Sequence, residues 1–238
     1  MGWLMKKYNL LSIIIPVYNE ARTINSILNL VIKSKLSIKK EIIIVNDGSK
    51  DSSLDIIKKF IKDHSKDNIK LINKSNGGKG SAVKLGIQKA KGQIIIIQDA
   101  DLEYDPNDHQ KCIQPIINGE CRVVYGSRAL EKTNDRYSHL SFFIGGKIIT
   151  FFTNLLFGSK LTDEATCYKT FDTKLIKSIK INGNKFDWEP EITAKILKKK
   201  IKIKEVPIKY YPRTIKQGKK INWKDGLEGI FTLIKYRF

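Results

Sequence analysis

Cysteine, histidine and long apolar runs are all scarce in this chain of 238 residues. Cys112, Cys121 and Cys167 are too few and too scattered for a disulfide framework or a zinc site, which indicates a reducing compartment. The three histidines lie in polar stretches with no G-x-S-x-G motif nearby, so we expect surface residues and no nucleophilic triad. The chain contains no run of about 18 or more apolar residues, so we expect no transmembrane helix. The N-terminal stretch does not have the pattern of a cleavable targeting signal.

Acidic residues are also underrepresented: 24 Asp and Glu face 44 Lys and Arg, for a formal net charge of +20. The stretch from Lys195 to Lys224 contains many basic residues and a single acid, Glu205. Such an excess implies an anionic partner, which can be a phosphate-bearing substrate, an acidic membrane surface or nucleic acid. A non-catalytic nucleic-acid-binding protein is supported by charge alone, because the chain has no recognisable binding motif for nucleic acid, and we expect no such partner.

The first half of the chain alternates strand and helix patterns. Continuous apolar runs predict buried strands at 11–17, 41–47, 69–73, 93–101 and 121–128. Helical patterns lie between them, over 20–33, from Asp51 onward and over 81–90. This alternation predicts an α/β fold with a doubly wound, mostly parallel sheet, in which ligands bind at the carboxyl ends of the strands.

The second half changes rhythm. Residues 140–157 form an amphipathic segment, 162–171 indicate a loop and then a strand, 189–200 a helix, and 201–212 an exposed alternating strand. No repeat or linker interrupts the chain. We therefore expect a single domain over 1–238, with halves at 11–130 and 131–238, amphipathic helices in the second half and a basic tail.

Two carboxylates follow four consecutive isoleucines, in the sequence Gln98-Asp99-Ala100-Asp101. Such oxygen ligands suit Mg²⁺ or Mn²⁺, which commonly bind one or two carboxylates together with substrate phosphates. Glu103 is a candidate for a third ligand. The alternative is that these acids cap the following turn.

Polar residues follow the other strands as well. Asp47 can accept hydrogen bonds from a base or a ribose, or it can cap the next helix. The glycine loop at 76–81 opens a helix, so its N–H groups can face an anion, although a tight turn explains the loop equally well. Its spacing fits neither a Walker A loop nor a dinucleotide fingerprint, which disfavours a kinase and a dehydrogenase.

Taken together, these motifs resemble the family 2 glycosyltransferases with the A-type fold. The matching residues are Pro16-Val17-Tyr18-Asn19-Glu20, Asn46-Asp47-Gly48-Ser49, Asn76-x-Gly78-Lys79-Gly80, Asp99-Ala100-Asp101 and Tyr125-Gly126-Ser127-Arg128. The later motifs look like the dolichyl- or polyprenyl-phosphate hexose synthases within that family. They are the segment from Thr162 to Lys169, Trp188-Glu189-Pro190-Glu191-Ile192, and Pro212-Arg213 followed by Gly218-Lys219-Lys220.

The resemblance implies an inverting, metal-dependent enzyme that moves a hexose from a UDP- or GDP-sugar to a polyprenyl or dolichyl phosphate. It implies Mg²⁺ or Mn²⁺ as the cofactor, held by Asp99, Asp101 and Glu103, although the resembled synthases usually have Gln in place of Glu103. It implies that Arg128 binds the acceptor phosphate. The nucleotide-sugar-binding residues it implies are Pro16, Tyr18, Glu20, Asp47, Lys79, Asp99, Arg213 and Lys219.

The nature of the acceptor stays open. A lipid phosphate is already ionised and needs no general base; Asp101 and Arg128 are catalytic candidates with either acceptor. A hydroxyl acceptor, such as diacylglycerol or a surface glycan, requires a carboxylate base, for which Asp163, Glu189 and Glu191 are the candidates. Glu191 can instead be a first-turn acid that interacts with the helix dipole.

The amphipathic segment at 140–157 fits a membrane-bound acceptor, because its Phe and Leu face can lie in the interface while basic residues attract anionic headgroups. The alternative is that it packs on the core or forms a dimer. We expect no C-terminal transmembrane helices, and therefore peripheral docking at the cytoplasmic face of a membrane, with an integral-membrane partner as a possibility.

Overall fold

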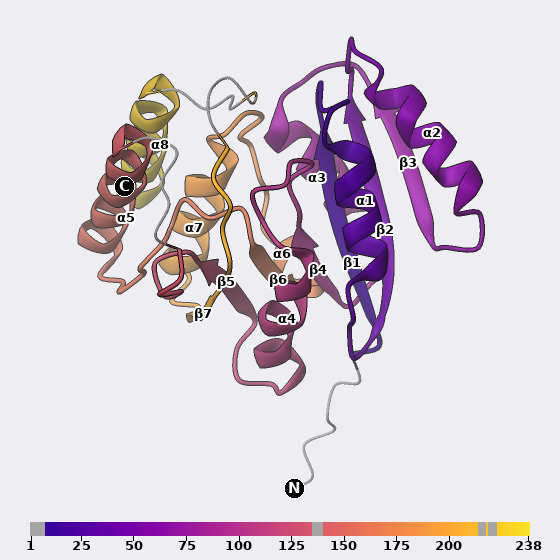
Figure 1. Ribbon diagram of the computed structural model, residues 1–238. Helices are drawn as coiled ribbons and strands as arrows, with labels where there is room; N and C mark the ends of the chain where they lie inside the picture. Colours follow the sequence, from indigo (N-terminus) through magenta and orange to yellow (C-terminus); the bar gives the residue numbers. More distant parts are fainter. Residues whose placement is uncertain (1–7, 135–139, 214–217, 219–222) are drawn as a thin grey trace, which may run out of the picture.

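The protein is built around one mixed seven-stranded sheet (Figure 1). The computed structural model describes residues 8–134, 140–213, 218 and 223–238. The strand order is β3-β2-β1-β4-β6-β5-β7. The strands are β1 (Leu10–Val17), β2 (Lys39–Asp47), β3 (Ile69–Lys74), β4 (Ile94–Ile97), β5 (Val123–Ser127), β6 (Lys169–Asp172) and β7 (Ile203–Pro207). The predicted mostly parallel α/β sheet is confirmed.

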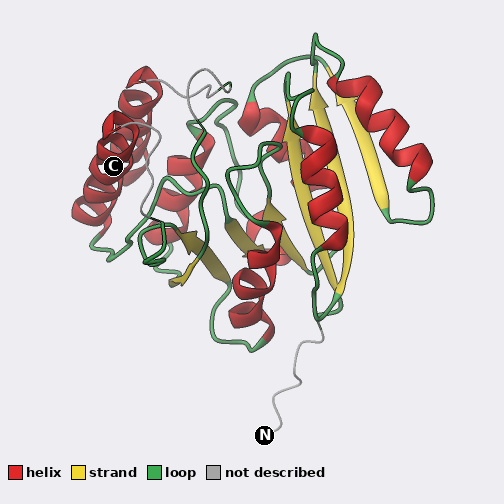
Figure 2. Cartoon of the chain, in the orientation of Figure 1, coloured by secondary structure: helices red, strands yellow, loops and turns green. Residues whose placement is uncertain are grey.

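The isoleucine runs of the sequence form the centre of this sheet. Ile14 of β1, Ile43 of β2 and Ile96 of β4 are fully buried, because helices cover both faces of the sheet (Figure 2). The connections between strands supply α1 (Ile24–Lys33), α2 (Ser53–Asp63), α3 (Lys79–Lys89), a short 3₁₀ turn (Pro106–Asp108) and α4 (His109–Ile117). Since the chain returns from β3 across β2 and β1 to β4, α3 lies on the opposite face from α1 and α2.

One strand departs from the expected pattern. β6 inserts between β4 and β5 and runs antiparallel to both. A short apolar run does not reveal the direction of its strand, so this antiparallel insertion was not predictable from the sequence. The basic stretch from Lys195 onward is also partly built into the fold, because β7 pairs in parallel with β5 at the edge of the sheet.

The remaining helices are α5 (Leu140–Phe157), α6 (Thr173–Lys177), α7 (Trp188–Lys198) and α8 (Trp223–Arg237). The predicted amphipathic segment at 140–157 coincides with α5. Helices α5 and α8 lie side by side at one end of the molecule (Figure 1), where Ile149, Ala194 and Leu233 form a small second core. A Cβ added at Gly229 of α8 would come within 2.6 Å of the Ile149 side chain, which shows how closely the two helices approach. Within the described residues, no helix is long and apolar enough to cross a membrane.

Candidate active site at the carboxyl ends of the strands

Asp47, at the end of β2, organises the glycine loop. Its two carboxylate oxygens accept hydrogen bonds from the backbone N–H groups of Gly77, at 3.0 Å, and Gly78, at 2.8 Å. The amide of Asn76 donates to it at 3.2 Å, and the Lys74 ammonium forms an ion pair with it. The Asp47 carboxylate therefore accepts the loop N–H groups that the sequence analysis considered as donors to an anionic ligand.

The backbone N–H groups at the start of α3 also donate to groups of the protein. The N–H of Gly80 donates to the Lys185 carbonyl at 3.1 Å, and the N–H of Ser81 donates to the Asn184 carbonyl at 2.9 Å. Of the two interpretations left open for this loop, an anion site or a tight turn, the contacts of these two N–H groups favour a structural role, because they attach the loop at 182–185 to the end of the sheet. A Cβ at Gly80 would lie only 2.7 Å from the Gly183 carbonyl oxygen, so glycine is required by this close approach.

Lys79, at the first position of α3, lies between two carboxylates from distant parts of the chain. Its ammonium is 2.8 Å from Asp99 and 2.9 Å from Glu189, which is in the first turn of α7. Burial alone would lower the pKa of Lys79, but the two carboxylates outweigh burial and raise that pKa well above its usual value. Burial would raise the pKa of Asp99, yet Lys79 holds it below its usual value. Both groups are therefore charged at neutral pH.

Asp101 faces Arg213 from the C-terminal half of the chain. The two side chains form an ion pair at 3.1 Å, and the same guanidinium contacts Glu20 after β1 at 3.1 Å. Burial, together with the negative charges of Asp99 and Glu103, raises the pKa of Asp101 to about 7, although Arg213 opposes the shift. The structure thus brings Glu20, Asp99, Asp101 and Arg213 together at the ends of the strands. Three of these four side chains are carboxylates, so negative charge is concentrated at this point.

Glu103 is bound differently from the other two predicted metal ligands. One of its carboxylate oxygens accepts the hydroxyl of Tyr210 at 3.0 Å and the backbone N–H of Arg213 at 2.8 Å. Across the described ranges, no group of three or more His, Cys, Asp or Glu side chains is arranged to hold a metal ion. Asp99, Asp101 and Glu103 therefore do not form a three-carboxylate metal site. A metal ion here would need substrate oxygens to complete its coordination.

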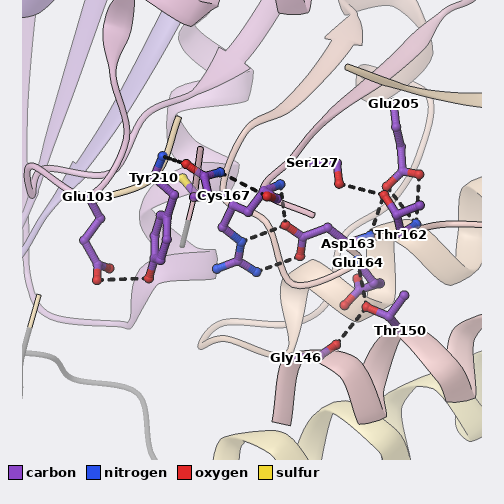
Figure 3. Close-up of polar contacts among 12 residues, drawn as sticks. Glu103, Ser127, Gly146, Thr150, Thr162, Asp163, Glu164, Cys167, Glu205 and Tyr210 are labelled. Carbon is purple, nitrogen blue, oxygen red and sulfur yellow. Dashed lines mark hydrogen bonds and ion pairs between the residues drawn. The ribbon is translucent and has the colours of Figure 1, made fainter. Parts of the chain in front are cut away.

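Arg128, directly after β5, forms an ion pair with Asp163, which is labelled in Figure 3. The Nε and one terminal nitrogen of Arg128 donate to the two oxygens of Asp163 at 2.7 Å and 2.6 Å, and the backbone N–H of Arg128 donates at 2.9 Å. Burial disfavours the charged form of both Arg128 and Asp163, but the opposite charge of each partner stabilises the charged form of the other. The pKa of Asp163 therefore falls below its usual value and that of Arg128 rises well above its own.

The carboxylate of Glu205 on β7 holds the segment that carries Asp163. It accepts the backbone N–H groups of Thr162 and Asp163, each at 3.0 Å or less. Sequence reasoning noted Glu205 only as an isolated acid in a basic stretch. Its alternation with apolar neighbours indicated a strand, but nothing in the sequence indicated which backbone it would meet.

Glu191 is a structural residue of α7. Its buried carboxylate accepts the N–H groups of Asn182, at 2.8 Å, and Gly183, at 2.6 Å, and it pairs with Lys195 one turn later. Glu189, the other candidate base on this helix, is the partner of Lys79. All three candidate bases therefore have carboxylate oxygens engaged by protein groups.

For the remaining predicted residues we report only their positions in the fold. Pro16 lies in β1 opposite Val45 of β2, and Tyr18 follows the strand directly. Lys219 lies outside the described residues. The expectation that the histidines are surface residues is wrong for His109: it is fully buried and bonds Gln98 at 2.8 Å, and burial lowers its pKa to about 3.

Comparison with known protein families decides what this arrangement belongs to. The family model described as glycosyl transferase family 2 matches residues 12–180. The chain belongs to glycosyl transferase family 2. It is therefore a glycosyltransferase.

The names of two relatives state the acceptor of the sugar. The UDP-N-acetylglucosamine–dolichyl-phosphate N-acetylglucosaminyltransferase of Methanococcus voltae is 31% identical over 216 residues, which cover 84% of this chain and 85% of that protein. The dolichyl-phosphate beta-glucosyltransferase of Dictyostelium discoideum is 37% identical over 143 residues, 56% of this chain and 44% of that one. The predicted resemblance to dolichyl- and polyprenyl-phosphate transferases is confirmed.

Solved structures agree on the fold. Glucosyl-3-phosphoglycerate synthase from Mycobacterium tuberculosis, in complex with Mn²⁺, UDP and glucosyl-3-phosphoglycerate, superimposes with a TM-score of 0.70 at 15% identity. The match covers 96% of this chain and 80% of the synthase. The fold is the A-type glycosyltransferase fold that the sequence motifs predicted.

Proposed function

We propose that this glycosyltransferase moves a hexose from a UDP- or GDP-sugar to a polyprenyl or dolichyl phosphate, with inversion at the anomeric carbon. The observation that carries the proposal is the state of the three candidate bases. Asp163, Glu189 and Glu191 are each bound to cations or backbone N–H groups. A hydroxyl acceptor requires a base that can take a proton, whereas a phosphate acceptor arrives ionised.

The donor side of the site suits a sugar diphosphate. In the transfer, the bond from the anomeric carbon to the diphosphate breaks, its electron pair leaves with the diphosphate, and a phosphate oxygen of the acceptor forms the new bond. Arg213 lies where it can stabilise the departing charge. Its Nε is buried and has no hydrogen-bond partner among the described residues, and a diphosphate oxygen would satisfy such a donor.

The residues also fit a divalent metal. The carboxylate oxygens and the excess of negative charge that Asp99 and Glu103 place beside Asp101 suit Mg²⁺ or Mn²⁺. The metal, once bound with the donor, would act as a Lewis acid that stabilises the leaving diphosphate. The Mn²⁺ and UDP named in the solved relative support this part of the proposal.

On the acceptor side, Arg128 is the residue we assign to the lipid phosphate. Asp163 occupies one edge of its guanidinium, so donors on the other terminal nitrogen are available to a phosphate oxygen. The M. voltae relative, which covers most of both chains, is named for transfer to dolichyl phosphate, and this supports the same class of acceptor.

We further propose that the face formed by α5 and α8 docks on an anionic bilayer. Side chains from both helices expose large apolar surface, among them Phe151 and Leu155 of α5 and Phe231 of α8, each at least 61% exposed. The net charge of +20 complements anionic headgroups. The cytoplasmic face and an integral-membrane partner stay predictions from the sequence.

Radiolabelled sugar transfer tests the activity. UDP-glucose, UDP-N-acetylglucosamine and GDP-mannose are each offered with farnesyl phosphate or diacylglycerol, in Mn²⁺, Mg²⁺ or EDTA. We expect metal-dependent transfer to farnesyl phosphate that is lost in Asp101→Asn and kept in Asp105→Asn, a matched control at a turn-capping acid. Transfer to diacylglycerol alone would overturn the phosphate acceptor, and activity in EDTA would overturn the metal.

Vesicle sedimentation tests the membrane face. The protein should pellet with vesicles that contain phosphatidylglycerol, and less with pure phosphatidylcholine. Phe151→Ser together with Phe231→Ser should reduce binding, whereas Leu30→Ser, an exposed apolar residue of α1 on another part of the surface, should not. Equal binding by all three proteins would reject this face as the docking surface.

A further inference from the structure

Tyr210 connects the donor and acceptor sides of the site, and sequence reasoning did not single it out. It follows β7 and forms an isolated antiparallel bridge with Tyr104. Its backbone N–H donates to the Asn134 side chain at 2.9 Å, and that side chain in turn donates to the Arg128 carbonyl at 3.0 Å. The Tyr104 ring meets the Tyr210 ring edge-on, with centroids 5.3 Å apart. The ring of Tyr210 is therefore fixed from several directions.

The hydroxyl of Tyr210 points to the donor side. It donates to Glu103 at 3.0 Å, as the dashed line in Figure 3 shows. The same carboxylate oxygen accepts the backbone N–H of Arg213, and the Arg213 guanidinium holds Asp101 and Glu20. The position of this hydroxyl is thus linked to the groups that we assign to the sugar diphosphate.

The ring of Tyr210 serves the acceptor side. The central carbon of the Arg128 guanidinium lies 5.0 Å from the ring centroid, within the range in which a cation is attracted to an aromatic face. Asp163 holds the edge of the guanidinium through two hydrogen bonds. Arg128 is therefore held by a carboxylate at its edge and by the tyrosine ring across its face.

We propose that Tyr210 is a positioning residue that keeps the acceptor-binding guanidinium of Arg128 in register with the donor-side carboxylate of Glu103. This inference rests on the proposed function and extends it. It assigns separate tasks to two parts of one side chain: the ring orients Arg128 toward the acceptor phosphate, and the hydroxyl orients Glu103 and the segment that carries Arg213.

Two substitutions separate these tasks. Tyr210→Phe keeps the ring and removes the hydroxyl, whereas Tyr210→Leu removes both. The matched control is Tyr211→Leu, because Tyr211 is the neighbouring tyrosine and is 56% exposed. Calorimetric titration measures two affinities for each purified protein, one for UDP in the presence of Mn²⁺ and one for farnesyl phosphate. Circular dichroism checks that each variant is folded.

We expect the Phe and Leu variants to weaken UDP binding alike, by roughly two- to tenfold, because both lose the hydrogen bond to Glu103. We expect only the Leu variant to weaken farnesyl phosphate binding, by roughly three- to thirtyfold, the effect of losing one cation–π contact. The acceptor KM in the transfer assay should follow the same division. Tyr211→Leu should bind both ligands as the wild type does.

The possible failures are distinguishable. If wild-type protein binds farnesyl phosphate and the Leu variant binds it equally well, the role of the ring is rejected while the proposed acceptor stands. If both variants bind UDP as tightly as wild type, the role of the hydroxyl is rejected. A wild type that binds no farnesyl phosphate would reject the proposed acceptor and, with it, this role for Tyr210. Should the Leu variant fail to fold, the Phe variant alone still tests the division, since it must affect UDP and spare the lipid phosphate.

Discussion

Replacement of Asp163 by asparagine tests whether this residue anchors Arg128 or acts as a base. The substitution keeps the shape of the side chain and removes the charge that faces a guanidinium whose side chain is only 24% exposed. Breaking a buried ion pair costs about 3–5 kcal/mol. Because Arg128 keeps some contact with water and asparagine keeps one acceptor oxygen, we expect the free energy of unfolding to fall by about 3 kcal/mol, at the lower end of that range.

Urea denaturation of wild type, Asp163→Asn, Arg128→Ala and the double variant measures this loss as a double-mutant cycle. The two single losses should sum to about 2 kcal/mol or more beyond the loss in the double variant, because removing both partners leaves no unpaired charge. Additive losses would refute the buried pair. An Asp163→Asn protein with unchanged stability and acceptor KM but a collapsed kcat would show instead that Asp163 is a base.

The pH dependence of the same difference has a defined sign. The folded-state pKa of Asp163 lies below the ordinary value of 3.8, so its charge stabilises the fold fully above pH 3.8. That contribution is lost as the pH falls through the lower, folded-state pKa. The difference in unfolding free energy between wild type and Asp163→Asn should therefore be constant near neutral pH and shrink below pH 3.8. A difference that grew in acid would contradict the assignment.

Three further substitutions test the supports of the site, each by urea denaturation. Glu191→Gln should cost about 1–3 kcal/mol, since either the N–H of Asn182 or the buried N–H of Gly183 loses its acceptor, and a folded variant should keep its kcat. Thr150→Val should cost about 1–3 kcal/mol, because the Glu164 N–H loses the hydroxyl of α5 that accepts it at 3.0 Å. Gly80→Ala should cost about 1–3 kcal/mol through overpacking against the Gly183 carbonyl. In each case a loss below about 0.5 kcal/mol, the range of ordinary surface changes, would contradict the contact.

The sheet was predictable because its signal is local. Isoleucine runs such as 94–97 are buried on both faces, and acids at their ends must gather where parallel strands end. The direction of β6 was not predictable, since an apolar run of four residues carries no record of its neighbours. The motifs placed Asp99 and Arg213 in one site, but they did not reveal that Asp47 would fill the glycine loop.

The same limit explains what sequence reasoning missed or left open. Glu191 and Asp163 stayed candidate bases because spacing cannot distinguish a carboxylate that accepts a proton from one that accepts backbone N–H groups. Tyr210 has no motif of its own, because its importance comes from two contacts with residues more than 80 positions earlier in the chain. Such pairings depend on tertiary geometry alone.

The charges of the site are arranged across the two halves of the chain. Asp101 and Glu20, which follow early strands, share Arg213 from the C-terminal half, while Arg128 is held by Asp163 and Tyr210 from that same half. Each of these early groups is therefore paired with a later segment. If the later segments are displaced, Asp101 loses Arg213 and Arg128 loses Asp163, the ion-pair partners that the described residues give them. The donor and acceptor sides should for this reason be assembled or lost as one unit, which is the behaviour that transfer between two separately bound substrates requires.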